Sequence, residues 1–122
     1  MYARSPRLPV LLVLAALPVL GLGCSGPNCQ STCDRLFQTT ECDLESPGVS
    51  LTDERNNCLD ACEYALSIPG DINDNGYDPN QRTTGSRSVD LKNDEEAAAW
   101  MECVDATSCQ YLSDGYCAPV SF

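Results

Sequence analysis

The side chains with the most distinctive chemistry in this sequence are its nine cysteines, and four of them repeat one short pattern. The pattern is Cys-x-x-x-Cys followed by an acid and, after one residue, two apolar residues; it begins at Cys29 and again at Cys58. On a helix, positions i, i+4, i+7 and i+8 share one face. Each copy therefore predicts a helix that carries two thiols and two apolar side chains on one stripe. Two such helices, packed antiparallel, would be joined by the bridges Cys29–Cys62 and Cys33–Cys58.

Four further cysteines follow in the rest of the chain, and eight thiols allow 105 pairings. We expect Cys42–Cys103, which would join a third helix to the segment between the first two, and Cys109–Cys117, which would close the last turn. Thiolate zinc and a thiol carrier are the alternatives to structural bridges. The carrier predicts free or easily reduced thiols, whereas structural bridges predict none.

A second candidate site is the oxygen-rich loop from Gly70 to Asp78. Its Asp-x-Asn-x-Asn-Gly pattern resembles the first half of an EF-hand or dockerin calcium loop, in which oxygen ligands alternate and a glycine allows a sharp turn. Carried over from that resemblance, the calcium ligands are Asp71, Asn73, Asn75 and Tyr77 through its backbone carbonyl, and Asp78 or Asp74 is the candidate to replace the ligand missing from the second half. The second half departs from the family, because Pro79 and Arg82 stand where ligands belong. A solvated turn without any cofactor is the alternative.

The sequence contains no histidine, and this excludes several kinds of catalytic site. There is no Ser-His or Cys-His nucleophile pair and no His-ligated metal. Neither a glycine-rich phosphate loop nor a Cys-x-x-Cys redox motif is present. We therefore expect no enzyme, with a carboxylate-dependent hydrolase as the catalytic alternative.

The N-terminus has the layout of an export signal: Arg4 and Arg7, an apolar run over 8–22, and a small-residue exit. The run is shorter than the roughly 20 residues that span a bilayer comfortably. Its end, Gly23-Cys24, resembles the lipobox of bacterial lipoprotein precursors, although a glycine stands where that family has a large aliphatic residue three positions before the cysteine.

This resemblance implies that residues 1–23 are a signal peptide, that Cys24 is lipidated, and that residues 24–28 form a tether. Ser25 is compatible with sorting to the outer membrane of a bacterial cell envelope. The cysteine count agrees, because assigning Cys24 to a thioether leaves eight cysteines that can pair completely. A secreted or periplasmic protein without the lipid is the alternative.

The net negative charge of the chain restricts the kinds of partner that it can bind. The chain has 18 acidic and 7 basic residues, a net charge of −11, and cleavage of the leader would remove Arg4 and Arg7. Such a surface repels nucleic acid and suits a basic partner or divalent cations. We expect a membrane partner through the N-terminal lipid and an unknown envelope protein as a second partner.

The elements that position these residues form one small all-α domain, residues 29–122, stapled by disulfides because its apolar content allows only a thin core. N-capping residues and apolar spacing predict helices over 29–37, 50–66, 94–105 and 108–113. The first two form an antiparallel hairpin over 29–66, followed by a long irregular loop over 67–92 and a C-terminal helical segment over 93–117. The hairpin resembles coiled-coil-helix-coiled-coil-helix domains and small mitochondrial chaperones in layout only.

From sequence, the function is that of a structural or interaction module of the cell envelope, with a calcium-binding envelope module as the alternative.

Overall fold

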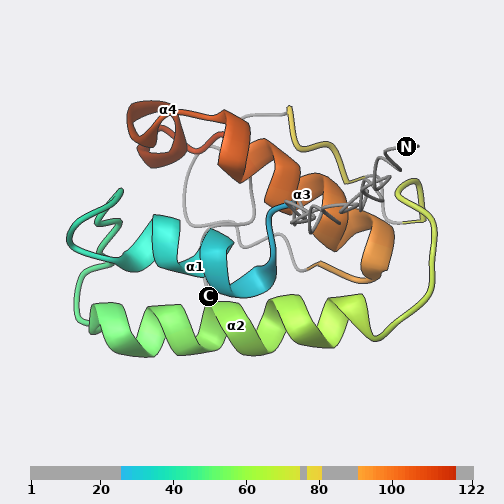
Figure 1. The fold of residues 1–122 in the computed structure, drawn as a ribbon, viewed down its shortest axis with the longest axis horizontal. Coiled ribbons are helices and arrows are strands. Elements are labelled where there is room, and N and C mark those ends of the chain that lie inside the picture. The colour runs from blue at the N-terminus through green and yellow to red at the C-terminus, as the bar shows by residue number, and fades with distance from the viewer. Residues whose placement is uncertain (1–25, 75–76, 81–90, 118–122) are drawn as a thin grey trace, which may run out of the picture.

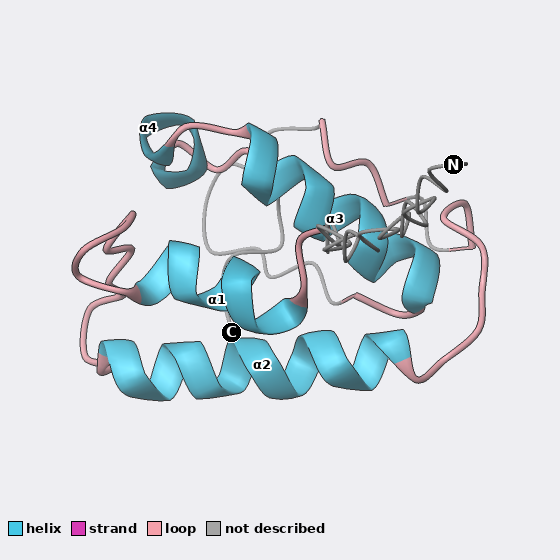
Figure 2. Ribbon diagram, in the orientation of Figure 1, coloured by secondary structure: helices cyan, strands magenta, loops and turns pink. Residues whose placement is uncertain are grey.

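The computed structural model describes residues 26–74, 77–80 and 91–117, which form four helices and no strand. The helices are α1 (Cys29–Phe37), α2 (Leu51–Leu66), α3 (Asp94–Ala106) and α4 (Cys109–Ser113). Helices α1 and α2 lie antiparallel, and α3 packs against both of them, while α4 follows at the far end of α3 (Figures 1 and 2). The predicted small, disulfide-stapled all-α fold is confirmed, and each helix begins and ends within one residue of its prediction.

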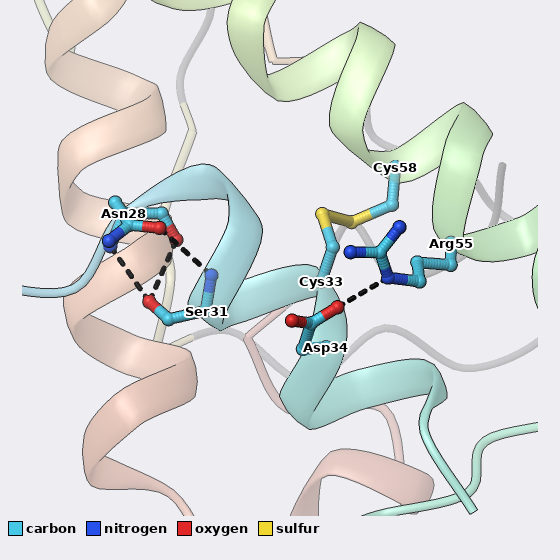
Figure 3. Close-up of polar contacts among 6 residues, drawn as sticks. All are labelled: Asn28, Ser31, Cys33, Asp34, Arg55 and Cys58. Atoms are coloured by element: carbon cyan, nitrogen blue, oxygen red, sulfur yellow. Dashed lines mark hydrogen bonds and ion pairs between the residues drawn. A yellow bond between two sulfur atoms is a disulfide. The ribbon is translucent and has the colours of Figure 1, made fainter.

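Side-chain caps set where the three longer helices begin. The Oδ1 of Asn28 accepts a hydrogen bond from the backbone N–H of Ser31 at 2.9 Å, and the Ser31 hydroxyl accepts one from the N–H of Asn28 at 3.0 Å (Figure 3). Ser50 caps α2 and Asn93 caps α3 in the same way, through the N–H three residues later. These bonds satisfy backbone donors that have no partner inside a helix.

The core is thin and built largely from half-cystines and α3. Trp100 is fully buried and is the largest side chain at its centre. Around it lie the inward faces of α1 and α2 and a few residues of the connecting loops. The buried apolar residues are Cys29, Cys33, Leu36, Phe37, Cys58, Cys62, Ala65, Tyr77, Leu91, Ala97, Met101, Val104, Leu112 and Cys117.

Two bridges staple the hairpin, and we call them the hairpin bridges. They are Cys29–Cys62 and Cys33–Cys58, with Cα–Cα distances of 5.7 and 5.8 Å, and both follow the antiparallel register that the sequence predicts. The second of them is drawn in Figure 3. Leu66 differs from its prediction, because it shares the thiol stripe but is 43% exposed. Helix α1 begins at Cys29, opposite Cys62, so no α1 residue covers the next turn of α2.

The other two predicted bridges are wrong. The structure joins Cys42 to Cys109, which we call the loop bridge, and Cys103 to Cys117, which we call the C-terminal bridge. The reason is a chain reversal after α4, where Gly115 adopts a left-handed φ of 93°. The reversal returns Cys117 to α3 instead of leaving it beside its neighbour on α4.

One arginine fastens α1 to the end of α3. The guanidinium of Arg35 donates to the carbonyl oxygens of Val104 and Thr107 at 3.1 and 2.8 Å. These carbonyls lie at the C-terminal end of α3, where the helix dipole favours a cation. Arg35 also lies 3.9 Å from the carboxylate of Glu41. A second arginine, Arg55 on α2, forms an ion pair with Asp34 on α1 (Figure 3).

Candidate functional site

The predicted lipidation site, Cys24, lies outside the described residues, and so does the predicted signal peptide. The described chain begins at Gly26, and Asn28 is fixed as the N-cap of α1. Cys24 stands four positions before Asn28 in the sequence, and an extended chain spans at most about 3.6 Å per residue. The Cα of Cys24 therefore lies within about 14 Å of the Cα of Asn28.

The candidate calcium loop forms a turn that is held by its own side chains. The Oδ1 of Asp71 accepts hydrogen bonds from the backbone N–H and the side-chain amide of Asn73, both at 2.8 Å. These two bonds hold the pKa of the Asp71 carboxyl below its ordinary value, because they stabilise the charged form. The carboxylate of Asp74 accepts in turn from the N–H of Asp71 at 2.9 Å.

This loop is docked on the first turn of α3. The amide of Asn93 donates to the carbonyl of Asp71 at 2.9 Å, and the N–H of Gly70 donates to the carboxylate of Asp94 at 3.1 Å. Gly70 is in close contact with the cap, since a Cβ at this position would lie 2.5 Å from the side chain of Asn93. Asn93 therefore both caps α3 and holds the loop, which explains why it is buried.

The predicted calcium ligands are placed as follows. Asn75 lies outside the described residues. Tyr77 is buried, with its ring in the core, and the Oδ1 of Asp78 accepts a hydrogen bond from the N–H of Asn80 at 2.9 Å. Within the described ranges, no three His, Cys, Asp or Glu side chains come together where they could hold a metal ion. Calcium binding by Asp71 and its neighbours stays a prediction.

Burial gives Tyr77 a role that the sequence does not indicate. Its pKa is raised well above the ordinary value, first by desolvation and then by the negative charges of Glu96 and Asp78. The phenol, which is neutral at physiological pH even with its ordinary pKa, therefore stays neutral in more alkaline solution as well. Its hydroxyl has no hydrogen-bond partner in the described part of the chain, so Tyr77 acts here as an apolar side chain.

Two buried glutamates complete the polar interior, and both fold back onto the segment before their own helix. The carboxylate of Glu96 accepts from the N–H of Lys92 at 2.6 Å, and that of Glu54 accepts from the N–H of Ser46 at 3.0 Å. Their places in the first turns of α3 and α2, three and four residues after a capping residue, are a signal for such a contact. These bonds give both acids a structural role in bracing the segments that enter the helices.

All eight cysteines in the described residues are bridged. The thiols that the sequence singles out for possible zinc binding or thiol transfer are thus occupied with one another. The sequence offers no histidine to replace them as a nucleophile or base.

Comparison with protein-family models, with curated proteins and with solved structures gives no match to this chain. The function is therefore inferred from the residues of this chain. No helix in the part of the chain that the structure describes has the length and apolar character needed to cross a bilayer.

Proposed function

We propose that this protein is a lipid-anchored module of the bacterial cell envelope, attached through Cys24, which acts by interaction or structural support. The observation that carries the proposal is the complete pairing of Cys29 to Cys117 in four bridges. Of nine cysteines, Cys24 alone is left over, and it stands at the lipobox-like end of an export signal. A thioether to a diacylglyceryl group gives this cysteine a chemical partner.

The bridges also support an extracytoplasmic location. Disulfides form and persist in oxidising compartments, whereas the cytosol keeps thiols reduced. A domain with so thin a core depends on such bridges, each of which contributes about 2–4 kcal/mol to the free energy of unfolding. The export signal and the bridges thus favour the same compartment for independent reasons.

An interaction role fits the distribution of charge. The basic side chains in the described residues are Arg35, Arg55 and Lys92, and both arginines are engaged inside the module. The exposed surface of the described part of the chain is therefore strongly acidic, which favours a basic partner protein over nucleic acid.

Intact mass of the mature protein, isolated from membranes of a bacterial host, tests the proposal. We expect cleavage before Cys24, a mass increase for diacylglyceryl and amide-linked acyl groups, and four disulfides in non-reducing peptide maps. The matched variant Cys24→Ser should keep its leader and carry no lipid. A mature chain without lipid would favour the secreted or periplasmic alternative, and eight free thiols would contradict the proposal altogether.

A further inference from the structure

Two segments at one end of the helical hairpin contain no charged residue, although the chain as a whole is strongly acidic. Neither residues 26–33 nor residues 64–70 contain a charged side chain, whereas the full sequence has 18 acids. The Cys29–Cys62 bridge holds these two segments side by side. We call them together the uncharged end.

The uncharged end also exposes large apolar side chains. Tyr64 is 68% exposed and Leu66 is 43% exposed, and Pro69 after them is exposed as well. The cause is the offset of the two helices, because α2 continues for four residues beyond Cys62 while α1 starts at Cys29 (Figure 1). The last turn of α2 therefore lacks the helix that covers the earlier turns.

The positions of these side chains limit the shape of what can cover them. Tyr64 and Leu66 are two residues apart, so they point to opposite sides of α2. A partner helix laid along α2 would contact one of them only. A surface that is broader than the helix and also meets the exposed Pro69 beyond its end can reach both.

The attachment point proposed above lies near the same end. Cys24 is within about 14 Å of Asn28, and Asn28 caps the first turn of α1 in the uncharged end. Acyl chains on Cys24 therefore enter the bilayer close to Tyr64 and Leu66. This step depends on the proposed lipidation.

We infer that the uncharged end rests on the membrane surface, with Tyr64 and Leu66 in the headgroup region of the bilayer. Tyrosine is favoured there because its ring is apolar and its hydroxyl remains in contact with water. Acids border the uncharged end on several sides: Asp60 and Glu63 precede Tyr64 on α2, and Asp34 and Asp71 directly follow its two segments. Asp94 on α3 donates its N–H to the carbonyl of Ile68 at 2.9 Å. These acids favour a zwitterionic surface over an anionic one.

The opposite end of the module supplies a matched control. Tyr111 belongs to α4 and is 57% exposed. Helix α4 lies toward the other end of the longest axis from the end of α2 (Figure 1). A module seated on its uncharged end holds Tyr111 away from the bilayer. The two tyrosines then differ in their contact with lipid but little in their exposure.

The test uses the full-length, lipidated protein in phosphatidylcholine vesicles with and without brominated acyl chains, which quench nearby tryptophan fluorescence. The variants are Tyr64→Trp, Leu66→Trp and the control Tyr111→Trp, each corrected for the buried Trp100. We expect a blue shift and loss of most of the added emission for the first two, and neither change for the control. Replacing part of the lipid with phosphatidylglycerol should weaken the quenching.

The outcomes separate this inference from the proposed function. Intact mass of each sample reports the lipid on Cys24. Lipidated protein whose Tyr64→Trp emission is insensitive to brominated lipid would overturn the inference and leave the proposed function standing. Shielding from acrylamide without bromine quenching would show that protein, such as a second copy, covers this end, and would also overturn it. Protein without lipid would overturn both.

Discussion

Arg35 offers the sharpest test of how this small fold is held together. Its guanidinium donates two hydrogen bonds to carbonyl oxygens at the end of α3, at 3.1 and 2.8 Å, from a side chain that is 31% exposed. We expect Arg35→Met to keep the packing of the aliphatic stem and to remove both bonds and the charge.

The expected cost follows from these contacts. A hydrogen bond to a charged group contributes about 1.5–3 kcal/mol, and partial exposure places these two at or below the lower end of that range. A cation at a helix C-terminus adds about 0.3–1 kcal/mol. The substitution should therefore lower the free energy of unfolding by about 2–4 kcal/mol. Arg35→Lys should cost less, because it keeps the charge but not the two-pronged donor geometry.

Chemical denaturation without reductant, followed by circular dichroism, measures these values. Arg55→Met is the control, since Arg55 has a similar side-chain exposure of 28% and pairs with the carboxylate of Asp34 where Arg35 binds the carbonyls at the end of α3. A partly exposed ion pair of this kind contributes about 0.2–1 kcal/mol. Equal costs for the two Met variants would refute the view that Arg35 anchors the end of α3 to the hairpin.

Four further predictions concern the bridges and the loop on α3. Removing the loop bridge (Cys42→Ala with Cys109→Ala) should lower the free energy of unfolding by about 4 kcal/mol, against about 3 kcal/mol for the C-terminal bridge, because their sequence separations are 67 and 14. Denaturation without reductant measures both losses, and a larger loss for the C-terminal bridge would contradict the prediction. Gly70→Ala should cost about 1–3 kcal/mol, since its Cβ meets the cap of α3 at 2.5 Å, whereas Gly26→Ala, with open space, should leave the melting temperature unchanged. Because the pKa of Asp71 is lower in the folded state, its carboxylate stabilises the fold at pH values above the ordinary pKa of 3.8, and this stabilisation is lost as the pH falls through the folded-state pKa. Asp71→Asn should therefore weaken the dependence of the free energy of unfolding on pH in the acid range. An unchanged pH dependence in the variant would contradict this prediction. If the loop binds calcium, the melting temperature should rise with millimolar calcium and fall with chelator, and the melting temperature of Asp71→Asn should respond to neither. An unchanged melting temperature in the parent protein would contradict calcium binding.

The helices and the hairpin bridges could be predicted because their signals are local. Capping residues such as Asn28 and Asn93 mark helix starts, and thiols four residues apart on two antiparallel helices can pair in one register only. The loop bridge and the C-terminal bridge depend on how the chain reverses at Gly115, and no periodicity in the sequence records that reversal. The exposure of Leu66 has a similar cause. It follows from the offset between α1 and α2 along their axes, and the apolar stripe on either helix alone does not predict this offset.

The candidate site was predicted less completely. The Asp71 turn lies where its Asp and Asn residues indicate. In the structure, however, the oxygens and amides of this turn form hydrogen bonds with one another and with the first turn of α3. Tyr77 was predicted for its carbonyl, whereas its ring fills part of the core. An aromatic residue in a polar loop carries no signal that distinguishes these two uses. The role of Cys24 still depends on the sequence alone.

The order of the cysteines along the chain has a consequence for biosynthesis. Numbered from Cys29 to Cys117, the eight cysteines pair first with fifth, second with fourth, third with seventh and sixth with eighth. No bridge joins two consecutive members of this series. An oxidase that acts on thiols as they emerge during translocation would join neighbours first and produce incorrect pairs. Correct maturation then requires reshuffling by thiol–disulfide exchange. We therefore expect the yield of native protein to depend on a disulfide isomerase.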